Sequence, residues 1–371
     1  MQKNIMFKPI SAPLSVLLIS PYPNVHGGVA AFAETLKKHL INCKIYSLHV
    51  GNKGELNENT LIKCIRLATT LLKLVILVRK QDFDVVHLNP SLNTKSLFRD
   101  GMILFMLRIL RFRRVLVYFH GWDWAIEKCL RQSPWKRRIF VSLLNRTARI
   151  LVLAPEFRES LMDMGVGSNL ISCTCTLFDE NMFEGVSPAE PFSRTILYMS
   201  RFDAQKGMYE LLSAFACIAA EFPDTRLIFA GDGKEKGRLQ AHAGGLGLGD
   251  RVSFTGYVRD KEKAELLLGC TLFALPTYFA EGMPVALLEA MAAGKPLLTA
   301  NAGGIMHIIH EPENGIILNV VSEETVAEAL RRLLRDPGYC RKTGARNRTY
   351  AWKTFAAKIV AKNIEGIYRD L

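Results

Sequence analysis

The sequence predicts an α/β protein built from two doubly wound domains with parallel sheets. Short apolar runs rich in β-branched and aromatic residues alternate with longer helical patterns along the chain, as they do in β-α-β units. The chain has 371 residues, more than one ordinary core accommodates, so we expect two domains of similar size. Domains of this class bind their ligands at the carboxyl ends of the strands.

We predict strands at eleven short apolar runs, with helical patterns such as residues 29–40 between them. Five runs lie in the first half, at residues 14–20, 44–50, 84–89, 114–120 and 149–154. Six lie in the second half, at residues 195–200, 226–231, 251–256, 272–276, 296–300 and 315–319. Residues 184–195 have no periodicity and contain two prolines, which favours a linker.

The positive charge is concentrated in the first half of the chain. The net charge is +13, and the first 150 residues hold 24 Lys and Arg against 8 Asp and Glu. Such a patch suits an anionic membrane surface or nucleic acid. The apolar, basic segment 101–114 favours the membrane, as an interfacial helix, and nucleic acid is not expected as a partner. The alternative for this segment is a core helix followed by a buried strand.

A cytoplasmic location is expected. No run is long and apolar enough to cross a bilayer, and residues 1–12 lack the apolar region of a signal peptide. The eight cysteines show no paired C-x-x-C spacing, which favours free thiols in a reducing compartment.

Two cations follow the strand predicted at 195–200. Arg201 stands at the strand end, and Lys206 and Gly207 precede a helical pattern. Two cations beside the positive end of a helix dipole suit a phosphate or diphosphate. The alternative is a pair of solvated surface charges.

Glycines and a histidine follow other predicted strands. Gly27 and Gly28 allow close approach of a ligand to the backbone, but neither the NAD nor the ATP fingerprint is present. His120 stands at a strand end, and this position is compatible with either a ligand contact or a structural role. Gly231 and Gly233 predict a tight turn, whether or not they touch a ligand.

A helix starting at Pro284 and ending before Gly294 is apolar on every side except at Glu289. A buried carboxylate without a partner costs several kcal/mol (order of magnitude) or becomes neutral. Glu289 therefore needs a ligand or a buried basic partner. A second carboxylate, Glu281, precedes the helix.

These motifs together resemble those of retaining glycosyltransferases with the GT-B fold, specifically glycosyltransferase family 4 of the bacterial surface-polysaccharide type. Glu281 and Glu289 match its E-x7-E motif, and the Arg201 to Gly207 stretch matches R-x4-K-G. The Gly-Gly at 27–28 and the His-Gly at 120–121 fit the same pattern. The resemblance is strongest over residues 194–320. The chain departs from it where Gly-Met-Pro follows Glu281, since many members have Phe-Gly there, and this puts the donor-sugar preference in doubt.

The resemblance implies two Rossmann-like domains facing a central cleft. Residues 1–185 would bind the acceptor and contact the membrane, residues 186–350 would bind a nucleotide sugar, and residues 351–371 would form a helix that crosses back to the N-terminal domain.

The resemblance also implies roles for the site residues. Glu289 would bind the ribose, and Glu281 would bind the donor sugar. His120 would contact the donor sugar or position the acceptor. Arg201 and Lys206 would stabilise the diphosphate. Donor contacts would also come from the backbone of Gly27, Gly28, Gly282, Met283, Pro284 and Val285.

The expected activity is transfer of a sugar from a nucleotide sugar, UDP-linked rather than GDP-linked, to a lipid-linked saccharide at the inner membrane. No metal or other cofactor is expected. The alternatives are a soluble-acceptor sugar synthase, a sugar-nucleotide epimerase and, with the site degenerate, a non-enzymatic binding protein.

Overall fold

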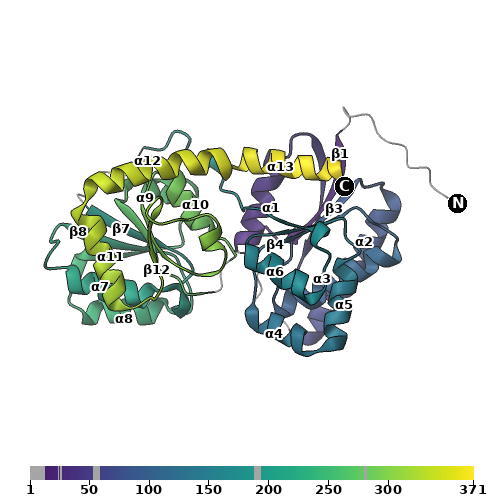
Figure 1. Ribbon diagram of the computed structural model, residues 1–371, viewed down its shortest axis with the longest axis horizontal. Helices are drawn as coiled ribbons and strands as arrows, with labels where there is room; N and C mark the ends of the chain where they lie inside the picture. Colours follow the sequence, from purple (N-terminus) through teal and green to yellow (C-terminus); the bar gives the residue numbers. More distant parts are fainter. Residues whose placement is uncertain (1–12, 24, 26, 53–58, 188–193, 280–281) are drawn as a thin grey trace. The chain divides into compact units, whose positions relative to one another are not determined.

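The computed structural model describes residues 13–23, 25, 27–52, 59–187, 194–279 and 282–371 (Figure 1). The chain forms two compact units. The first consists of Met1–Val152, Phe157–Thr174 and Lys358–Leu371, and the second of Leu153–Glu156 and Cys175–Ala357. Each unit contains a six-stranded sheet whose pairings are all parallel. The predicted α/β class with two doubly wound sheets is therefore confirmed.

The sheet of the first unit has the strand order β2-β1-β3-β4-β5-β6. Its strands are β1 (Leu14–Pro21), β2 (Cys43–Val50), β3 (Val85–Leu88), β4 (Val115–Phe119), β5 (Arg149–Val152) and β6 (Ile171–Cys173). The helices are α1 (Gly28–His39), α2 (Thr60–Lys80), α3 (Thr94–Ile109), α4 (Trp124–Gln132), α5 (Pro134–Leu144), α6 (Pro155–Met164) and α13 (Ala357–Asp370), with the 3-10 helix η1 (Ser168–Leu170). Strands β3 and β4 are buried throughout, as expected for a parallel sheet covered on both faces.

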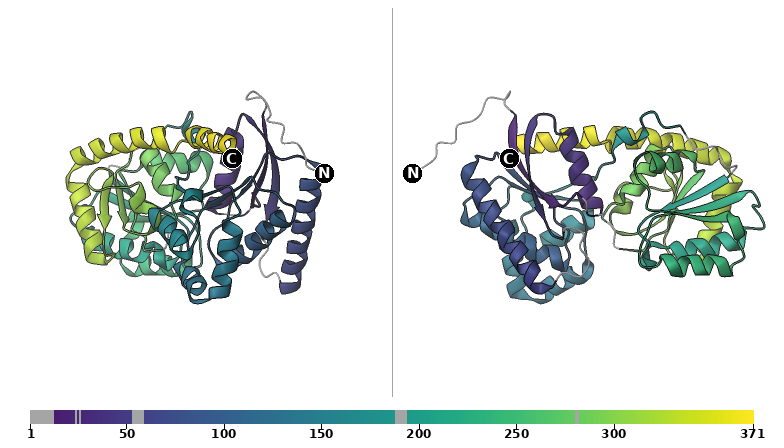
Figure 2. Two further views of the ribbon diagram at one scale, coloured as in Figure 1. Left: turned by 45° about the vertical axis from the view of Figure 1, so that its right-hand side comes forward. Right: turned by 180° about the vertical axis from the view of Figure 1, so that it is seen from behind.

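Helices cover both faces of this sheet (Figures 1 and 2). Helices α1 and α13 lie on the face that carries His87 and Tyr118. Phe32 of α1 packs edge-on against Tyr118, and Tyr368 of α13 hydrogen-bonds His87 at 2.6 Å. Helices α2, α3 and α5 pack side by side on the opposite face. The last helix of the chain is therefore part of the core of the first unit.

The sheet of the second unit has the order β12-β11-β10-β7-β8-β9. Its strands are β7 (Arg194–Met199), β8 (Thr225–Ala230), β9 (Val252–Gly256), β10 (Leu272–Leu275), β11 (Leu297–Ala300) and β12 (Gly315–Leu318). The helices are α7 (Met208–Ile218), α8 (Lys236–Gly245), α9 (Asp260–Gly269), α10 (Val285–Ala292), α11 (Glu323–Arg335) and α12 (Pro337–Thr354). Short 3-10 helices are η2 (Glu180–Phe183), η3 (Ala204–Lys206), η4 (Gly249–Arg251) and η5 (Gly303–His307).

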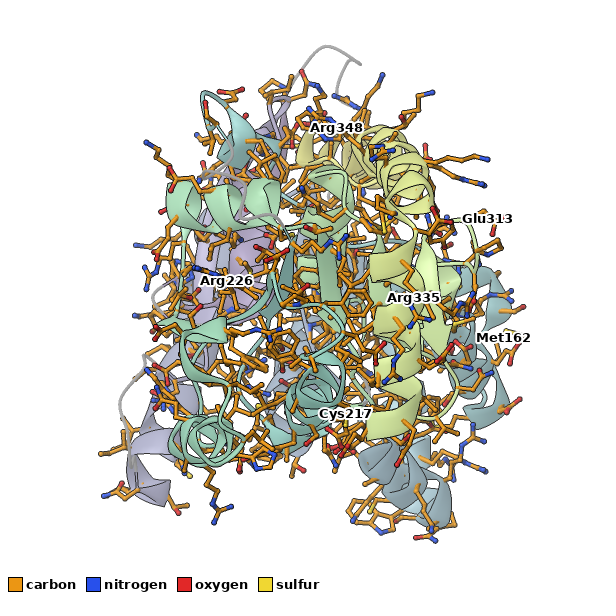
Figure 3. The ribbon with its side chains drawn as sticks, turned by 90° about the vertical axis from the view of Figure 1, so that its left-hand side faces the viewer. Met162, Cys217, Arg226, Glu313, Arg335 and Arg348 are labelled. Atoms are coloured by element: carbon orange, nitrogen blue, oxygen red, sulfur yellow. The ribbon has the colours of Figure 1, made fainter. Side chains whose placement is uncertain are left out.

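Two helical layers enclose the second sheet, with α7, α8 and α11 on one face and α9, α10 and α12 on the other (Figure 1). Figure 3 shows Cys217 of α7 and Arg335 of α11 on the first layer. There Cys217 Sγ donates to Glu323 Oε1 at 2.8 Å, and Arg335 Nη2 lies 3.0 Å from Glu221 Oε2. In the second layer α10 packs closely against α12.

The apolar, basic segment 101–114 forms the helix followed by a buried strand that was the alternative for it, while its contact with a membrane stays a prediction. Its first part belongs to α3, which buries Ile103 and Leu107 but leaves Phe98 and Phe105 exposed. The buried strand β4 follows the segment. Among the described helices none is long and apolar enough to span a membrane. Part of the predicted linker 184–195 lies outside the described residues.

Candidate active site

Arg201 follows β7 in a loop that lies against the loop after β8. A Cβ atom on Gly231 would lie 2.0 Å from Ser200 O, and one on Gly233 would lie 2.4 Å from Phe202 O. Both glycines have positive φ angles, 152° and 159°. The two glycines are therefore required by the close approach of the two loops, which positions the exposed Arg201. We refer to residues 201–207 as the cationic loop.

The cationic loop ends against the segment that follows β10. Gly207 has φ +73°, and a Cβ atom there would lie 2.0 Å from Pro276 O, so only glycine fits without displacement. Lys206 is buried, and its Nζ lies 4.5 Å from the centroid of the Phe279 ring, within the range of a cation-π interaction. The ammonium group is thus held beside the chain that leads to the E-x7-E motif.

Backbone hydrogen bonds fasten the two segments together. The N–H groups of Tyr278 and Phe279 both donate to Gln205 O, at 3.1 and 3.0 Å. Strands β7 and β10 are parallel neighbours, so their carboxyl ends lie at the same edge of the sheet. The structure therefore brings the cationic loop and the start of α10 together at one sheet edge.

The motif segment, residues 282–289, contains most of the predicted donor contacts after β10. Glu281 lies outside the described residues. Pro284 is the N-cap residue of α10 and has no N–H group, so the available backbone donors among the predicted four are Gly282, Met283 and Val285. Met283 is buried, with its sulfur 3.4 Å from the Thr176 nitrogen.

Gly304 supports the motif segment and was missed by the sequence analysis. It lies in η5, after β11, and a Cβ atom on it would stand 1.9 Å from Gly282 O. Any larger residue would push the start of the motif segment away. The Gly-Gly pair at 303–304 was the available signal, but nothing local tied it to the E-x7-E motif.

Glu289 is buried in α10, 6% exposed, and has a protein partner. Lys263 of α9 donates to its Oε1 atom at 2.5 Å. Burial disfavours the charge of Lys263, but the attraction and hydrogen bond to Glu289 outweigh it and raise the pKa of Lys263. The basic partner considered from the sequence is therefore present, while ribose binding by Glu289 stays a prediction. The sequence did not identify Lys263 as this partner, because Lys263 lies in a run of charged residues that is typical of a solvent-exposed helix face.

In the first unit, Gly27 and Gly28 stand at the start of α1, with Gly27 as the N-cap residue. A Cβ atom on either would meet nothing within 4 Å in the part of the unit that the structure describes. Packing against these residues therefore does not explain the two glycines.

His120 follows β4, and Asn89, at the end of the neighbouring strand β3, fixes its tautomer. Asn89 Nδ2 donates to Ile19 O at 3.2 Å, so its Oδ1 atom faces His120 Nε2, 2.9 Å away. Because that oxygen is an acceptor, Nε2 carries the proton and Nδ1 keeps its lone pair. His120 thus offers a hydrogen-bond acceptor at Nδ1.

The ring of His120 is packed among aromatic groups. It stacks on Tyr118 with the centroids 4.3 Å apart and meets Phe32 edge-on at 4.4 Å. Burial, with a smaller contribution from the nearby His87, lowers the pKa of His120 to about 3. The imidazole is therefore neutral at physiological pH.

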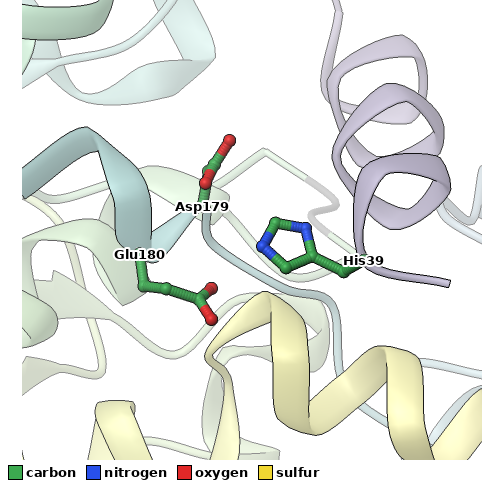
Figure 4. A group of neighbouring side chains, drawn as sticks. All are labelled: His39, Asp179 and Glu180. Atoms are coloured by element: carbon green, nitrogen blue, oxygen red, sulfur yellow. The ribbon is translucent and has the colours of Figure 1, made fainter. Parts of the chain in front are cut away.

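Asp179 and Glu180, near the start of the second unit, accept hydrogen bonds from the backbone. Figure 4 shows Asp179 and Glu180 at η2. Asp179 accepts from the Asn181 N–H at 3.2 Å, and Glu180 accepts from the Ala357 N–H at 2.7 Å. His39, also drawn there, belongs to the first unit and contacts Thr35 O at 2.9 Å. Within either unit, no three described His, Cys, Asp or Glu residues come close enough to share a metal ion.

The two Rossmann-like sheets are those of the GT-B fold, and the comparisons with known proteins identify the class as glycosyltransferase. The chain belongs to the family described as glycosyl transferases group 1, whose profile matches residues 181–350. The phosphatidyl-myo-inositol mannosyltransferase of Mycolicibacterium smegmatis is 30% identical over 301 residues, which are 76% of this chain and 71% of that enzyme.

Solved structures share the fold. Anabaena Alr3699/HepE in complex with UDP and glucose has a TM-score of 0.74 at 20% identity, over 96% of this chain and all of that one (100%). Sucrose-phosphate synthase from Thermosynechococcus elongatus has a TM-score of 0.77 at 19% identity, over 96% of this chain and 98% of that one. Identities this low establish the GT-B fold and nothing finer.

Proposed function

We propose that the chain is a retaining hexosyltransferase that moves a sugar from a nucleotide sugar, UDP-linked rather than GDP-linked, to a lipid-linked saccharide. One observation carries this proposal. The cationic loop is hydrogen-bonded to the segment after β10, so Arg201, Lys206 and the N-terminus of α10 share one sheet edge. An edge with two cations and the N–H groups at the start of a helix suits a diphosphate.

The proposed chemistry follows from where charge develops. As the bond from the anomeric carbon to the diphosphate breaks, negative charge grows on the leaving group. Arg201 and Lys206 stabilise that charge, helped by the backbone N–H groups of Gly282, Met283 and Val285. The acceptor hydroxyl oxygen bonds to the anomeric carbon on the face that the diphosphate leaves, which gives retention, and the departing phosphate takes the hydroxyl proton. No metal cofactor is proposed, because the two side-chain cations supply the countercharge.

Other residues bind the rest of the donor. Glu289 accepts hydrogen bonds from the ribose hydroxyls, with Lys263 keeping its buried charge balanced. Glu281 and His120 contact the donor sugar. His120 accepts a hydrogen bond from a sugar hydroxyl at Nδ1. Alternatively, His120 positions the acceptor substrate. Gly27 and Gly28 let the backbone of the N-terminal unit approach the donor.

The N-terminal unit is proposed to bind the acceptor and an anionic membrane. Its excess of Lys and Arg and the exposed Phe98, Phe105 and Trp135 support this, and the name of the mycobacterial relative specifies a lipid acceptor. The enzyme would act in cell-surface polysaccharide synthesis, lipopolysaccharide or capsule, on the cytoplasmic face of the inner membrane. Binding to anionic vesicles should then weaken strongly between low and high salt. Binding that does not depend on salt, or no binding, would refute the proposed membrane contact.

The donor is tested by thermal shift with a panel of UDP- and GDP-sugars, because a true donor stabilises the fold by mass action. Arg201→Met and Lys206→Met should abolish the shift, whereas Lys342→Met, an exposed change on α12, should keep it. Anomeric analysis of the product then tests retention. No shift with any nucleotide sugar would refute the proposal.

A further inference from the structure

Lys263 and Glu289 lie near the amino ends of two helices that begin at the carboxyl edge of the second sheet. Lys263 is the fourth residue of α9, which follows β9, and Glu289 is the fifth residue of α10, which follows β10. A helix that follows a parallel strand starts at the carboxyl end of that strand, where ligands of this fold class bind. The ion pair therefore belongs to the same sheet edge as the cationic loop.

Lys263 engages one of the two carboxylate oxygens of Glu289. Its Nζ atom donates to Oε1 at 2.5 Å. An ammonium group donates from a single nitrogen, whereas the planar fork of an arginine can bind both oxygens of a carboxylate. Within the described ranges of the chain, no donor is hydrogen-bonded to the other oxygen, Oε2. The carboxylate is thus held from one side and keeps an acceptor for a second donor.

The surroundings keep Lys263 charged. Burial disfavours the ammonium form, but the attraction and hydrogen bond to Glu289, with smaller contributions from Tyr257 and Asp260, outweigh it and raise the pKa of Lys263. The side chains of Lys263 and Glu289 remain 25% and 7% exposed. The pair is therefore a permanent cation and a nearly buried carboxylate that solvent reaches mainly at the lysine.

We propose that Lys263 positions the Glu289 carboxylate so that Oε2 accepts a hydrogen bond from one ribose hydroxyl, and that the pair thereby selects ribonucleotides over deoxyribonucleotides. This rests on the proposed function and names the residue that sets its ribose recognition. A hydroxyl bound to a carboxylate forms a charge-assisted hydrogen bond. A nucleotide that lacks this hydroxyl leaves a buried carboxylate oxygen unsatisfied, and binding sites reject such ligands strongly.

Calorimetric titration of the full chain with UDP, 2′-deoxy-UDP and 3′-deoxy-UDP tests the proposal, with the guanosine counterparts in their place if the donor screen selects GDP. The wild type should bind the ribonucleotide at least about tenfold more tightly than one of the two deoxy forms, because that form loses a hydrogen bond to a charged group. Equal binding of all three nucleotides would overturn the proposal.

The substitution Lys263→Met should lower this affinity ratio to less than about threefold, because the carboxylate loses the charge that orients it and is buried without a partner. Titration in trimethylamine N-oxide favours the folded state of the variant. Any unfolded fraction weakens all three nucleotides by the same factor, which cancels in the ratio. An unchanged ratio with uniformly weaker binding would mean that Lys263 is merely structural, and a larger ratio would mean that it competes with the ribose. Either result would overturn the proposal.

Two further variants isolate the path of the effect. Lys261→Met is the matched control, because Lys261 lies on the same helix with its side chain 74% exposed and its Nζ 3.6 Å from Glu265. It should keep the wild-type ratio, and an equal drop there would reduce the effect to the net charge of α9. In a Glu289→Gln background, Lys263→Met should change the ratio less than about twofold, since Lys263 acts through the carboxylate. A further drop in that background would assign the ribose contact to Lys263 itself and refute the positioning role.

These outcomes are distinguishable from a failure of the proposed function. Binding of the ribonucleotide without any preference for the ribose would remove the role of Lys263 and leave the donor shift intact. Failure of every nucleotide to bind the wild type would refute the proposed function, and the role of Lys263 with it.

Discussion

His120 can act at the site as a neutral hydrogen-bonding group, because burial keeps its pKa near 3 and Asn89 holds the proton on Nε2. A role as a cation beside the leaving group would require a charge that this environment disfavours. In the proposed function, Asn89 is therefore a positioning residue that acts through His120.

The substitution Asn89→Asp should create a new pH dependence. A carboxylate beside Nε2–H favours the imidazolium form and raises the pKa of His120, and protonation removes the Nδ1 acceptor. In the variant kcat/KM should fall by about tenfold per pH unit below the new pKa, while the wild type shows no such step between pH 5 and 8. A loss of equal size at every pH would mean that Asn89 is merely structural.

Lys263→Met should destabilise the second unit by about 3–5 kcal/mol, because it leaves the buried Glu289 carboxylate without its partner. Denaturant unfolding measures the change. The double variant Lys263→Met/Glu289→Gln should recover part of the loss, since no charge is then buried alone. Equal destabilisation in the single and double variants would contradict the pairing.

Asn89, Lys263 and Gly304 could not be predicted from the sequence because their partners are distant along the chain. Periodicity and strand-end position identified Arg201, Lys206 and His120 as candidates, since these signals are local. The apolar pattern between Pro284 and Gly294 likewise placed Glu289 in a buried helix, which the structure confirms. Which basic residue faces that carboxylate depends on how α9 and α10 pack, and no local pattern records it.

At the scale of elements, each of the eleven predicted strand runs overlaps a strand of the structure. The short strand β6, Ile171–Cys173, was not among these eleven runs, although the spacing of Cys173 and Cys175 also suggested a strand there. Proline and glycine predicted the ends of a helix correctly where the backbone conformation required these residues. Pro284 marks the start of α10, and Gly294, with φ +76°, follows its end.

Gly304→Ala should disable the donor site. The added methyl group cannot coexist with Gly282 O at 1.9 Å, so the motif segment must move, and donor affinity should fall by at least about tenfold, by analogy with other small displacements at active sites. Gly237→Ala is the matched control, because a Cβ atom there meets nothing within 4 Å. Inside α8 this change should raise the free energy of unfolding by about 0.5–1 kcal/mol. Thermal shift measures both, and an unchanged donor shift in Gly304→Ala would contradict the packing argument.

At the scale of the whole molecule, stability should fall in acid through buried imidazoles. Burial lowers the pKa of both His87 and His120 to about 3, below the ordinary value of about 6.5. Between these pH values the unfolded chain binds protons that the folded chain does not, so the free energy of unfolding decreases as pH falls. The expected slope is about 1.4 kcal/mol per pH unit for each histidine.

Urea unfolding of the first unit between pH 7 and pH 4.5 measures this slope. His87→Gln should remove the share of His87, although the variant starts from a lower stability because it loses the bond to Tyr368. An unchanged slope in this variant would mean that His87 is protonated in the folded chain.

The position of α13 has a consequence for how the protein is made. Tyr368 meets His87 281 positions away, and Glu365 accepts from Asn42 across 323 positions. During synthesis the N-terminal half therefore leaves the ribosome without a helix that its sheet needs, and it can mature only after residues 357–370 have been synthesised. Until then the part of that face that α13 covers stays accessible to chaperones, and removal of residues 357–370 would weaken the part of the protein that is synthesised first.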